Sequence, residues 1–114
     1  MNTAERKKSP NLSLRGAIGN YVIGTVVKRG ESANFKGTYY TILKVEETNG
    51  STTLDKKEVE IAAGDTVFIN ETRWLNQWMS ERKPGERIKL TYTGEQAPTS
   101  KGFKPTITYD MEII

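Results

Sequence analysis

Histidine and cysteine, the side chains on which much acid–base catalysis and transition-metal binding depend, are both missing from this sequence. Their absence excludes a zinc site, a Ser-His-Asp triad and a histidine general base. It also excludes disulfides and thiolate ligands. A chain without cysteine is typical of a reducing compartment, so we expect a cytoplasmic protein.

The remaining candidates for catalysis or metal binding are carboxylates that come in pairs. The pairs are Glu46 with Glu47, Glu58 with Glu60, and Asp110 with Glu112. The last two have the outward parity of strands, where carboxylates are usually solvated, and nothing in the sequence places two carboxylates across a cleft. Residues 64–65 form a turn that lacks the alternating oxygen ligands of a calcium loop. We therefore expect no enzyme, no cofactor and no metal.

Cations and aromatic rings are interleaved with glycines in two segments, residues 28–40 and 99–104. Cations neutralise phosphates, and flat rings stack on unpaired bases of any identity. This mixture indicates a surface that binds single-stranded nucleic acid. The candidate binding residues are Lys28, Arg29, Phe35, Lys36, Tyr40, Lys44, Lys101 and Lys104. Ordinary surface charge is the competing interpretation for the cations, since the net charge is only +3.

Alternation of apolar and polar residues predicts short strands that one helix interrupts. The first strand covers residues 21–29, with a bulge at Gly24, and the second covers residues 36–47. In the second, we expect Tyr39, Leu43 and Val45 to face inward and Tyr40, Ile42 and Lys44 outward. Residues 57–62 and 66–69 form either one kinked third strand or two separate ones. Two more strands cover residues 86–94 and 103–113.

The helix is predicted over residues 71–82, with Asn70 as its cap and Pro84 just beyond its end. Its apolar residues fall on one stripe: Trp74, Leu75, Trp78 and Met79. Core packing is the interpretation that we favour for both tryptophans, in preference to base stacking.

Residues 1–19 are rich in polar and basic side chains, and we expect a flexible basic arm there, followed by a single domain over residues 20–114. No segment has the apolar length of a membrane span, and the N-terminus does not resemble a signal peptide. Three strands, a helix and two strands form the order of an OB-type barrel. The sequence therefore predicts a mainly β fold, a five-stranded OB-type barrel with one helix between strands 3 and 4.

The chain also resembles a known family. The similarity lies in Gly-Asp-Thr-Val-Phe-Ile at residues 64–69, in Pro-Gly-Glu-Arg-Ile-Lys-Leu-Thr-Tyr-Thr-Gly-Glu at residues 84–95, and in a Lys-Gly loop before the last strand. In layout, residues 20–113 resemble the small OB-fold single-stranded DNA-binding proteins of tailed bacteriophages. The resemblance implies sequence-independent coating of DNA during phage replication or recombination. It points to Arg29, Phe35, Lys36, Tyr40 and Lys101.

Our main hypothesis is a non-catalytic single-stranded DNA-binding protein, with replication or recombination proteins as further partners. A protein–protein adaptor, such as a phage accessory factor that binds a host or viral enzyme, is the alternative. Binding of RNA through the same face stays open, because nothing in the sequence reports on a 2′-hydroxyl contact. The oligomeric state stays open as well.

Overall fold

The computed structural model describes residues 9–32, 37–96 and 106–114. Within them the chain forms eight strands and one short helix, and no helix there is long and apolar enough to cross a membrane. In chain order the elements are β1 (Asn11–Ser13), β2 (Tyr21–Glu31), β3 (Tyr39–Thr48), β4 (Ser51–Leu54), β5 (Lys57–Glu58), β6 (Thr66–Asn70), α1 (Arg73–Met79), β7 (Arg87–Gln96) and β8 (Thr106–Ile113).

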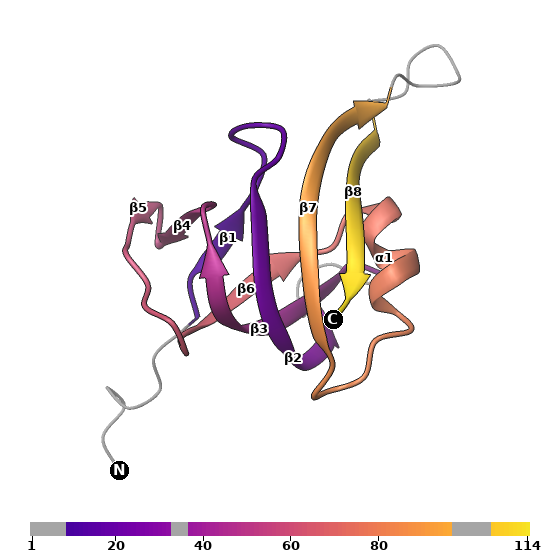
Figure 1. Cartoon of the computed structure of the whole chain (residues 1–114), viewed down its shortest axis with the longest axis horizontal. Coiled ribbons are helices and arrows are strands. Elements are labelled where there is room, and N and C mark those ends of the chain that lie inside the picture. Colours follow the sequence, from indigo (N-terminus) through magenta and orange to yellow (C-terminus); the bar gives the residue numbers. More distant parts are fainter. Residues whose placement is uncertain (1–8, 33–36, 97–105) are drawn as a thin grey trace.

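All eight strands belong to one open sheet in the order β5-β4-β1-β6-β3-β2-β7-β8 (Figure 1). The mainly β class is confirmed, but the predicted five-stranded closed barrel is wrong. Closure would require β8 to pair with β6. In the described part of the chain, that edge of β6 is taken by β1, which pairs in parallel through Asn11 and Phe68. Strands β5 and β8 are therefore the two edges of the sheet.

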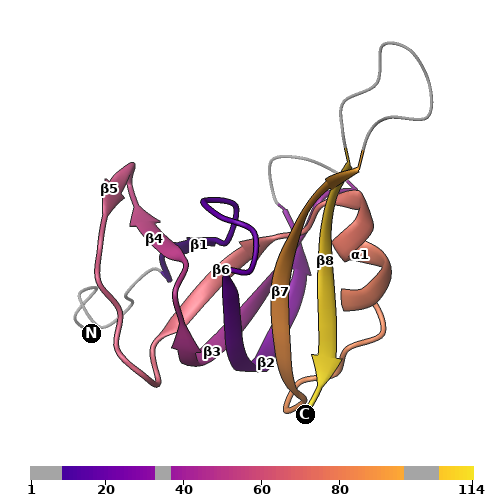
Figure 2. The same cartoon turned by 45° about the horizontal axis from the view of Figure 1, so that its top comes forward.

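The helix nevertheless occupies its expected place in the chain, after β2, β3 and β6 and before β7 and β8. Strands β6, β3, β2, β7 and β8 are neighbours and antiparallel throughout. The sheet curls, so that α1 lies beside β8 in both views (Figures 1 and 2). The open question of the third strand is settled, because β5 and β6 are two separate strands in different parts of the sheet.

Two register shifts interrupt the pairing of β2 with β3. The first lies next to Gly24, where a Cβ atom would come within 2.7 Å of the carbonyl oxygen of Lys44. This confirms the bulge expected at Gly24, since only a residue without a side chain allows so close a backbone approach. The second shift leaves Val27 exposed and places Lys28 opposite Ile42.

The hydrophobic core lies on the inner side of the curled sheet and beneath α1. Each fully buried Leu, Ile or Met side chain there contributes about 1.5–3 kcal/mol relative to an exposed one. The buried apolar residues are Leu12, Leu14, Val22, Val26, Leu43, Val45, Val67, Ile69, Leu75, Met79, Ile88, Leu90, Tyr92 and Tyr109. The inward positions expected for Leu43 and Val45 are thus confirmed, whereas Tyr39 is only half-buried.

Helix α1 is shorter than predicted, and its cap is Thr72 rather than Asn70. The Thr72 hydroxyl accepts a hydrogen bond from the Leu75 amide at 3.3 Å. Asn70 cannot take this role because it is the last residue of β6, where it pairs with Tyr40. Sequence patterns locate a helix more reliably than they locate its end residues.

The predicted core role is correct for one tryptophan only. Trp74 is partly buried and packs against the core, but Trp78 is 44% exposed. The two rings contact each other at a centroid distance of 5.7 Å. Because α1 has only about two turns, Leu75 and Met79 already cover the core, and Trp78 is left to pack on its neighbour.

The segment predicted as an arm contributes to the fold in its second half. Residues 11–13 form β1, which pairs with β4 as well as β6, and both Leu12 and Leu14 are buried. The hydroxyl groups of Ser9 and Thr66 are hydrogen-bonded at 2.6 Å. This part of the segment therefore belongs to the sheet rather than to an arm. The first eight residues lie outside the described residues.

Candidate nucleic-acid interface

Strands β3 and β6 present alternate side chains to opposite faces of the sheet. On β3, Thr41, Leu43 and Val45 are buried, so Tyr40, Ile42 and Lys44 face outward as expected from the sequence. On β6, Val67 and Ile69 are buried, so Phe68 and its neighbours Thr66 and Asn70 face outward. We call the side of β2, β3 and β6 that faces away from the core the outward face.

Two aromatic rings meet on the outward face. The ring centroids of Tyr40 and Phe68 are 4.8 Å apart and their planes are inclined at 50°. Neither side chain is fully buried, so part of each ring stays accessible. Rings this close leave no room for a base between them, so a base would stack on the accessible face of one ring, with the other ring packed beside it. We call the pair the stacking platform.

Gly30 on β2 allows the Tyr40 ring to lie where it does. The two residues are directly opposite in the register of β2 and β3. A Cβ atom on Gly30 would lie 2.6 Å from the Tyr40 hydroxyl oxygen and 2.8 Å from the ring carbon that bears it. The Tyr40 ring therefore lies across β2 in a position that a side chain at residue 30 would block.

A hollow of about 450 Å³ surrounds the two rings, and we call it the aromatic groove. Apart from the rings and Leu54, its walls are polar. The lining residues are Ser9, Asn11, Ser32, Tyr40, Leu54, Asp55, Phe68 and Asn70. Such a groove can bind a planar polar group, because its rings offer a stacking surface and its amides and hydroxyls can form hydrogen bonds.

Two predicted cations, Lys28 and Lys44, are exposed on the outward face, and each pairs with a residue two positions from one of the rings. Lys28 reaches the outward face because of the second register shift in β2, which pairs it with Ile42. Lys44 lies on β3, two positions beyond Ile42, where it pairs with Thr66 of β6. Both ammonium groups are thus available to phosphates that follow the same face.

Arg29, a third predicted cation, is engaged in an ion pair within the protein. Its Nη2 lies 2.9 Å from Oε1 of Glu71, and its Nε donates to both carboxylate oxygens at 3.1 and 3.0 Å. Its guanidinium also lies over the Tyr39 ring, 4.1 Å from the centroid. Arg29 is therefore a structural residue first, and a phosphate would compete with an intact ion pair for it.

The partner in this pair, Glu71, is a buried hub between β3 and α1. Its side chain is fully inaccessible to solvent. Besides Arg29, the carboxylate accepts hydrogen bonds from the Thr41 hydroxyl at 2.6 Å and from the Asn76 amide at 3.3 Å. A buried carboxylate with this many hydrogen-bond donors is fully compensated. Glu71 therefore has a structural role and is not a reactive group.

The other predicted site residues, Phe35, Lys36, Lys101 and Lys104, lie outside the described residues. Of the described ones, the structure brings Lys28, Tyr40 and Lys44 together on the outward face. Sequence reasoning missed Phe68, which completes the stacking platform. The signal was available, since the flanking Val67 and Ile69 are core residues at period two, and that alternation turns Phe68 outward.

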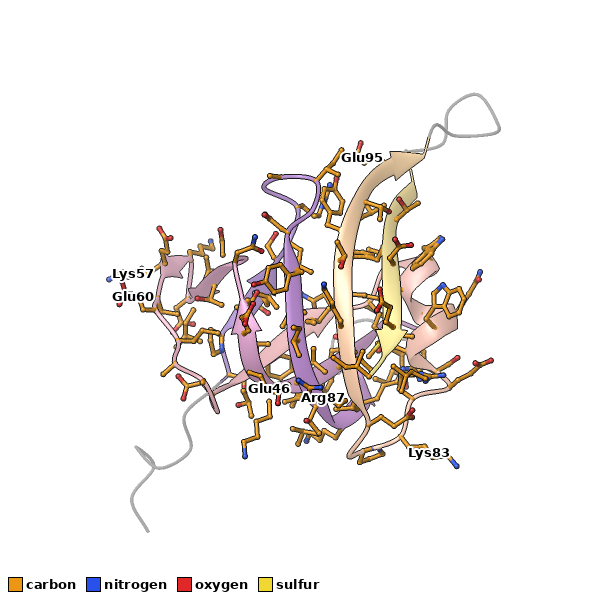
Figure 3. The ribbon with its side chains drawn as sticks, viewed as in Figure 1. Glu46, Lys57, Glu60, Lys83, Arg87 and Glu95 are labelled. Atoms are coloured by element: carbon orange, nitrogen blue, oxygen red, sulfur yellow. The ribbon has the colours of Figure 1, made fainter. Side chains whose placement is uncertain are left out.

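The same side of β2 continues toward β7, where charges are paired with one another. Figure 3 shows Glu46 and Arg87 side by side, and Nε of Arg87 donates to Oε2 of Glu46 at 2.6 Å. The Lys89 ammonium lies 5.5 Å from the centre of the Tyr21 ring. The Tyr21 hydroxyl donates to Glu47, and this hydrogen bond raises the pKa of Tyr21. This region offers phosphates less unpaired positive charge than the part of the outward face that carries Lys28 and Lys44.

A second hollow, of about 550 Å³, has the opposite electrostatic character. It lies between the end of β3 and residues 58–63, and its lining includes Glu46, Glu47, Glu58 and Glu60. Carboxylates in such number repel phosphates. Across the described ranges, no group of three or more Asp or Glu side chains is arranged to hold a metal ion.

Comparison with known proteins gives no further guide to this site. No family model, curated protein or solved structure matches the chain.

Proposed function

We propose that this chain is a non-catalytic protein that binds single-stranded DNA by base stacking and phosphate contacts. The observation that supports this most is the Tyr40–Phe68 pair, which is partly accessible on an open sheet face that also carries the exposed cations Lys28 and Lys44. The resemblance to bacteriophage single-stranded DNA-binding proteins extends the proposal to phage DNA replication or recombination in the bacterial cytoplasm.

The energetic balance of such a site favours stacking over charge. Each base stacked on an aromatic ring contributes about 1–3 kcal/mol. The charge contribution is small because few of the predicted cations in the described part of the chain are free to bind phosphate, since Arg29 is paired with Glu71. Each phosphate that a cation neutralises on a single strand changes the slope of log K against log salt concentration by only about 0.7. With two lysines on the same face as the rings, we expect the affinity to fall as salt concentration rises. The part of the binding free energy that comes from stacking on the rings should not depend on salt.

Fluorescence anisotropy with a labelled oligonucleotide tests the proposal. The protein is titrated into an unpaired oligonucleotide and into a duplex of the same sequence, over a series of salt concentrations. We expect the unpaired strand to bind more tightly, because duplex bases already stack on one another and cannot reach the rings. No affinity for the unpaired strand at low salt would remove the proposal.

A protein–protein adaptor is the second candidate function, and exposed apolar side chains favour it. Trp78 on α1 is 44% exposed, and Ile113 and Ile114 at the end of edge strand β8 are 59% and 46% exposed. Aromatic and apolar side chains of this kind anchor protein interfaces. Pull-down experiments with and without nuclease separate the two candidates, since a partner that is held through DNA is lost after digestion.

A further inference from the structure

The charges around the aromatic groove differ from one side to the other. On the β2 and β3 side, beyond the residues that line the groove, are the exposed cations Lys28 and Lys44. On the far side, beyond β6, β1 and β4, is Asp55, the first residue of the turn between β4 and β5. The platform of Tyr40 and Phe68 lies between the two sides.

Asp55 is held in a position from which it can accept a hydrogen bond. Its backbone is in the left-handed region, with φ of 52°, and the next residue, Lys56, has φ of 66°. This is the geometry of a tight two-residue hairpin turn. Asp55 is exposed at the rim of the groove, and within the described residues its carboxylate has neither a hydrogen-bond partner nor an ion-pair partner.

The order of groups across the sheet matches the order of groups in one nucleotide. Three strand spacings of about 4.8 Å separate β3 from β4, so Lys44 and Asp55 lie about 14 Å apart across the sheet at backbone level. Lys28, on β2, lies one spacing farther, at about 19 Å. A phosphate at the lysines and a base ring over Tyr40 and Phe68 would direct the base edge toward Asn11, Asn70 and Asp55.

The Asp55 carboxylate determines which base edges can form a hydrogen bond at the aromatic groove. An ionised carboxylate only accepts hydrogen bonds, and exocyclic amino groups are the donors that bases offer to it. Cytosine, adenine and guanine carry such a group. The one donor of thymine, its N3–H, lies between two carbonyl oxygens that an ionised Asp55 would repel. Resting on the proposed function, we infer that the aromatic groove is a base-reading subsite that prefers amino-bearing bases over thymine, with Asp55 as the discriminating residue.

Oligomers of deoxycytidine and of deoxythymidine of equal length test this inference, because both are pyrimidines and stack over a similar area. We expect the wild-type protein to bind the cytidine oligomer roughly fivefold more tightly at one salt concentration. Equal binding of the two oligomers would overturn the inference but leave the proposed function standing. Absence of binding to both would overturn the two together.

The Asp55→Asn variant then assigns the preference to this residue. Asparagine tolerates the left-handed backbone as well as aspartate does, so the turn is preserved. Its amide both donates and accepts, so we expect the ratio of the two affinities to fall to about one while total affinity holds or rises. A ratio that is unchanged in Asp55→Asn would contradict the role of Asp55.

Glu60→Gln is the matched control for the loss of one negative charge. Glu60 is exposed and lines a neighbouring hollow of about 440 Å³ that shares Ser9 and Leu54 with the aromatic groove. Its neutralisation should raise both affinities equally and leave the ratio as in the wild type. A ratio that falls as far in Glu60→Gln as in Asp55→Asn would show that net charge, and not base reading, causes the effect, and would overturn the inference.

Discussion

Arg29 and Glu71 form a partly buried ion pair that connects β2 to the start of α1, with Nη2 of Arg29 lying 2.9 Å from Oε1 of Glu71. The Glu71 amide also donates to the Tyr39 carbonyl at 3.0 Å, so both backbone and side chain of Glu71 hold this corner of the sheet together. The Arg29–Glu71 pair therefore stabilises the fold, whereas Tyr40 and Phe68, on the outward face, are the residues to which we assign binding in the proposed function.

Removal of the buried charge should destabilise the protein strongly. In Glu71→Gln, the Arg29 guanidinium loses its counter-ion, and we expect the free energy of unfolding to fall by about 3 kcal/mol, because breaking a buried pair leaves one charge without compensation. Urea denaturation measures this change. Glu81→Gln is the matched control, since the Glu81 side chain is 73% exposed and its pair with Arg82 should contribute below about 1 kcal/mol. Equal losses in the two variants would contradict the structural role of Glu71.

The two tryptophans should respond differently to truncation. Trp74 packs against the core, so Trp74→Ala should lower the free energy of unfolding by about 3 kcal/mol. Trp78 is largely exposed, and Trp78→Ala should cost no more than about 1 kcal/mol. Thermal melts of both variants, followed by circular dichroism, provide the comparison. If Trp78→Ala were the more damaging change, the packing of α1 described above would be wrong.

The sequence carried enough information for the local elements and too little for their assembly. Period-two alternation placed Tyr40 and Lys44 outward and Leu43 inward, and Gly24 marked a real bulge. Closure of a barrel, by contrast, depends on which strand pairs with the free edge of β6. The three-residue strand that pairs there has only Leu12 as its buried residue, too short a pattern for alternation to identify.

The site was predictable to a similar degree. A list of cations and rings is visible in sequence, but their engagement with other residues is not. Arg29 and Lys28 are adjacent cations and look equivalent in the sequence. Only the structure shows that Arg29 is paired, because its partner Glu71 is 42 residues away along the chain. For Phe68, alternation with the core residues Val67 and Ile69 predicts an outward side chain, but the sequence does not show that its aromatic partner is Tyr40 on another strand.

Gly30 offers a way to move the Tyr40 ring without removing it. In Gly30→Ala, the new Cβ would displace the ring from its place across β2, so we expect single-stranded DNA binding to weaken by about 1 kcal/mol. The Gly30 backbone is outside the left-handed region, so the free energy of unfolding should change by no more than about 1 kcal/mol. Anisotropy and urea denaturation measure the two quantities. Gly16→Ala, where the nearest atom to a new Cβ is 3.6 Å away, should change neither.

Alkaline pH should destabilise the fold through Tyr109. Burial raises the pKa of Tyr109 above its ordinary value of 10.0, an effect that the Arg15 charge opposes in part. Because the folded state holds this proton more tightly than the unfolded state, the stability it contributes is complete below about pH 10 and is lost as pH rises through the folded-state pKa.

The Tyr109→Phe variant isolates that contribution. It keeps the ring and removes the titrating hydroxyl, so the free energy of unfolding should fall less steeply above about pH 10 than in the wild type. Denaturation midpoints across the alkaline range measure the slope. Identical slopes in the two proteins would mean that Tyr109 does not contribute to the alkaline loss.

The most direct measurement compares the loss of two exposed rings on different parts of the surface. Phe68→Leu removes the ring from the aromatic groove but keeps apolar volume on β6, and Trp78→Ala removes an exposed ring from α1. In anisotropy titrations with an unpaired oligonucleotide, we expect Phe68→Leu to weaken binding by about 1–3 kcal/mol and Trp78→Ala to leave it unchanged. Unchanged binding by Phe68→Leu, with binding lost in Trp78→Ala, would place the DNA on α1 and contradict a site on the outward face.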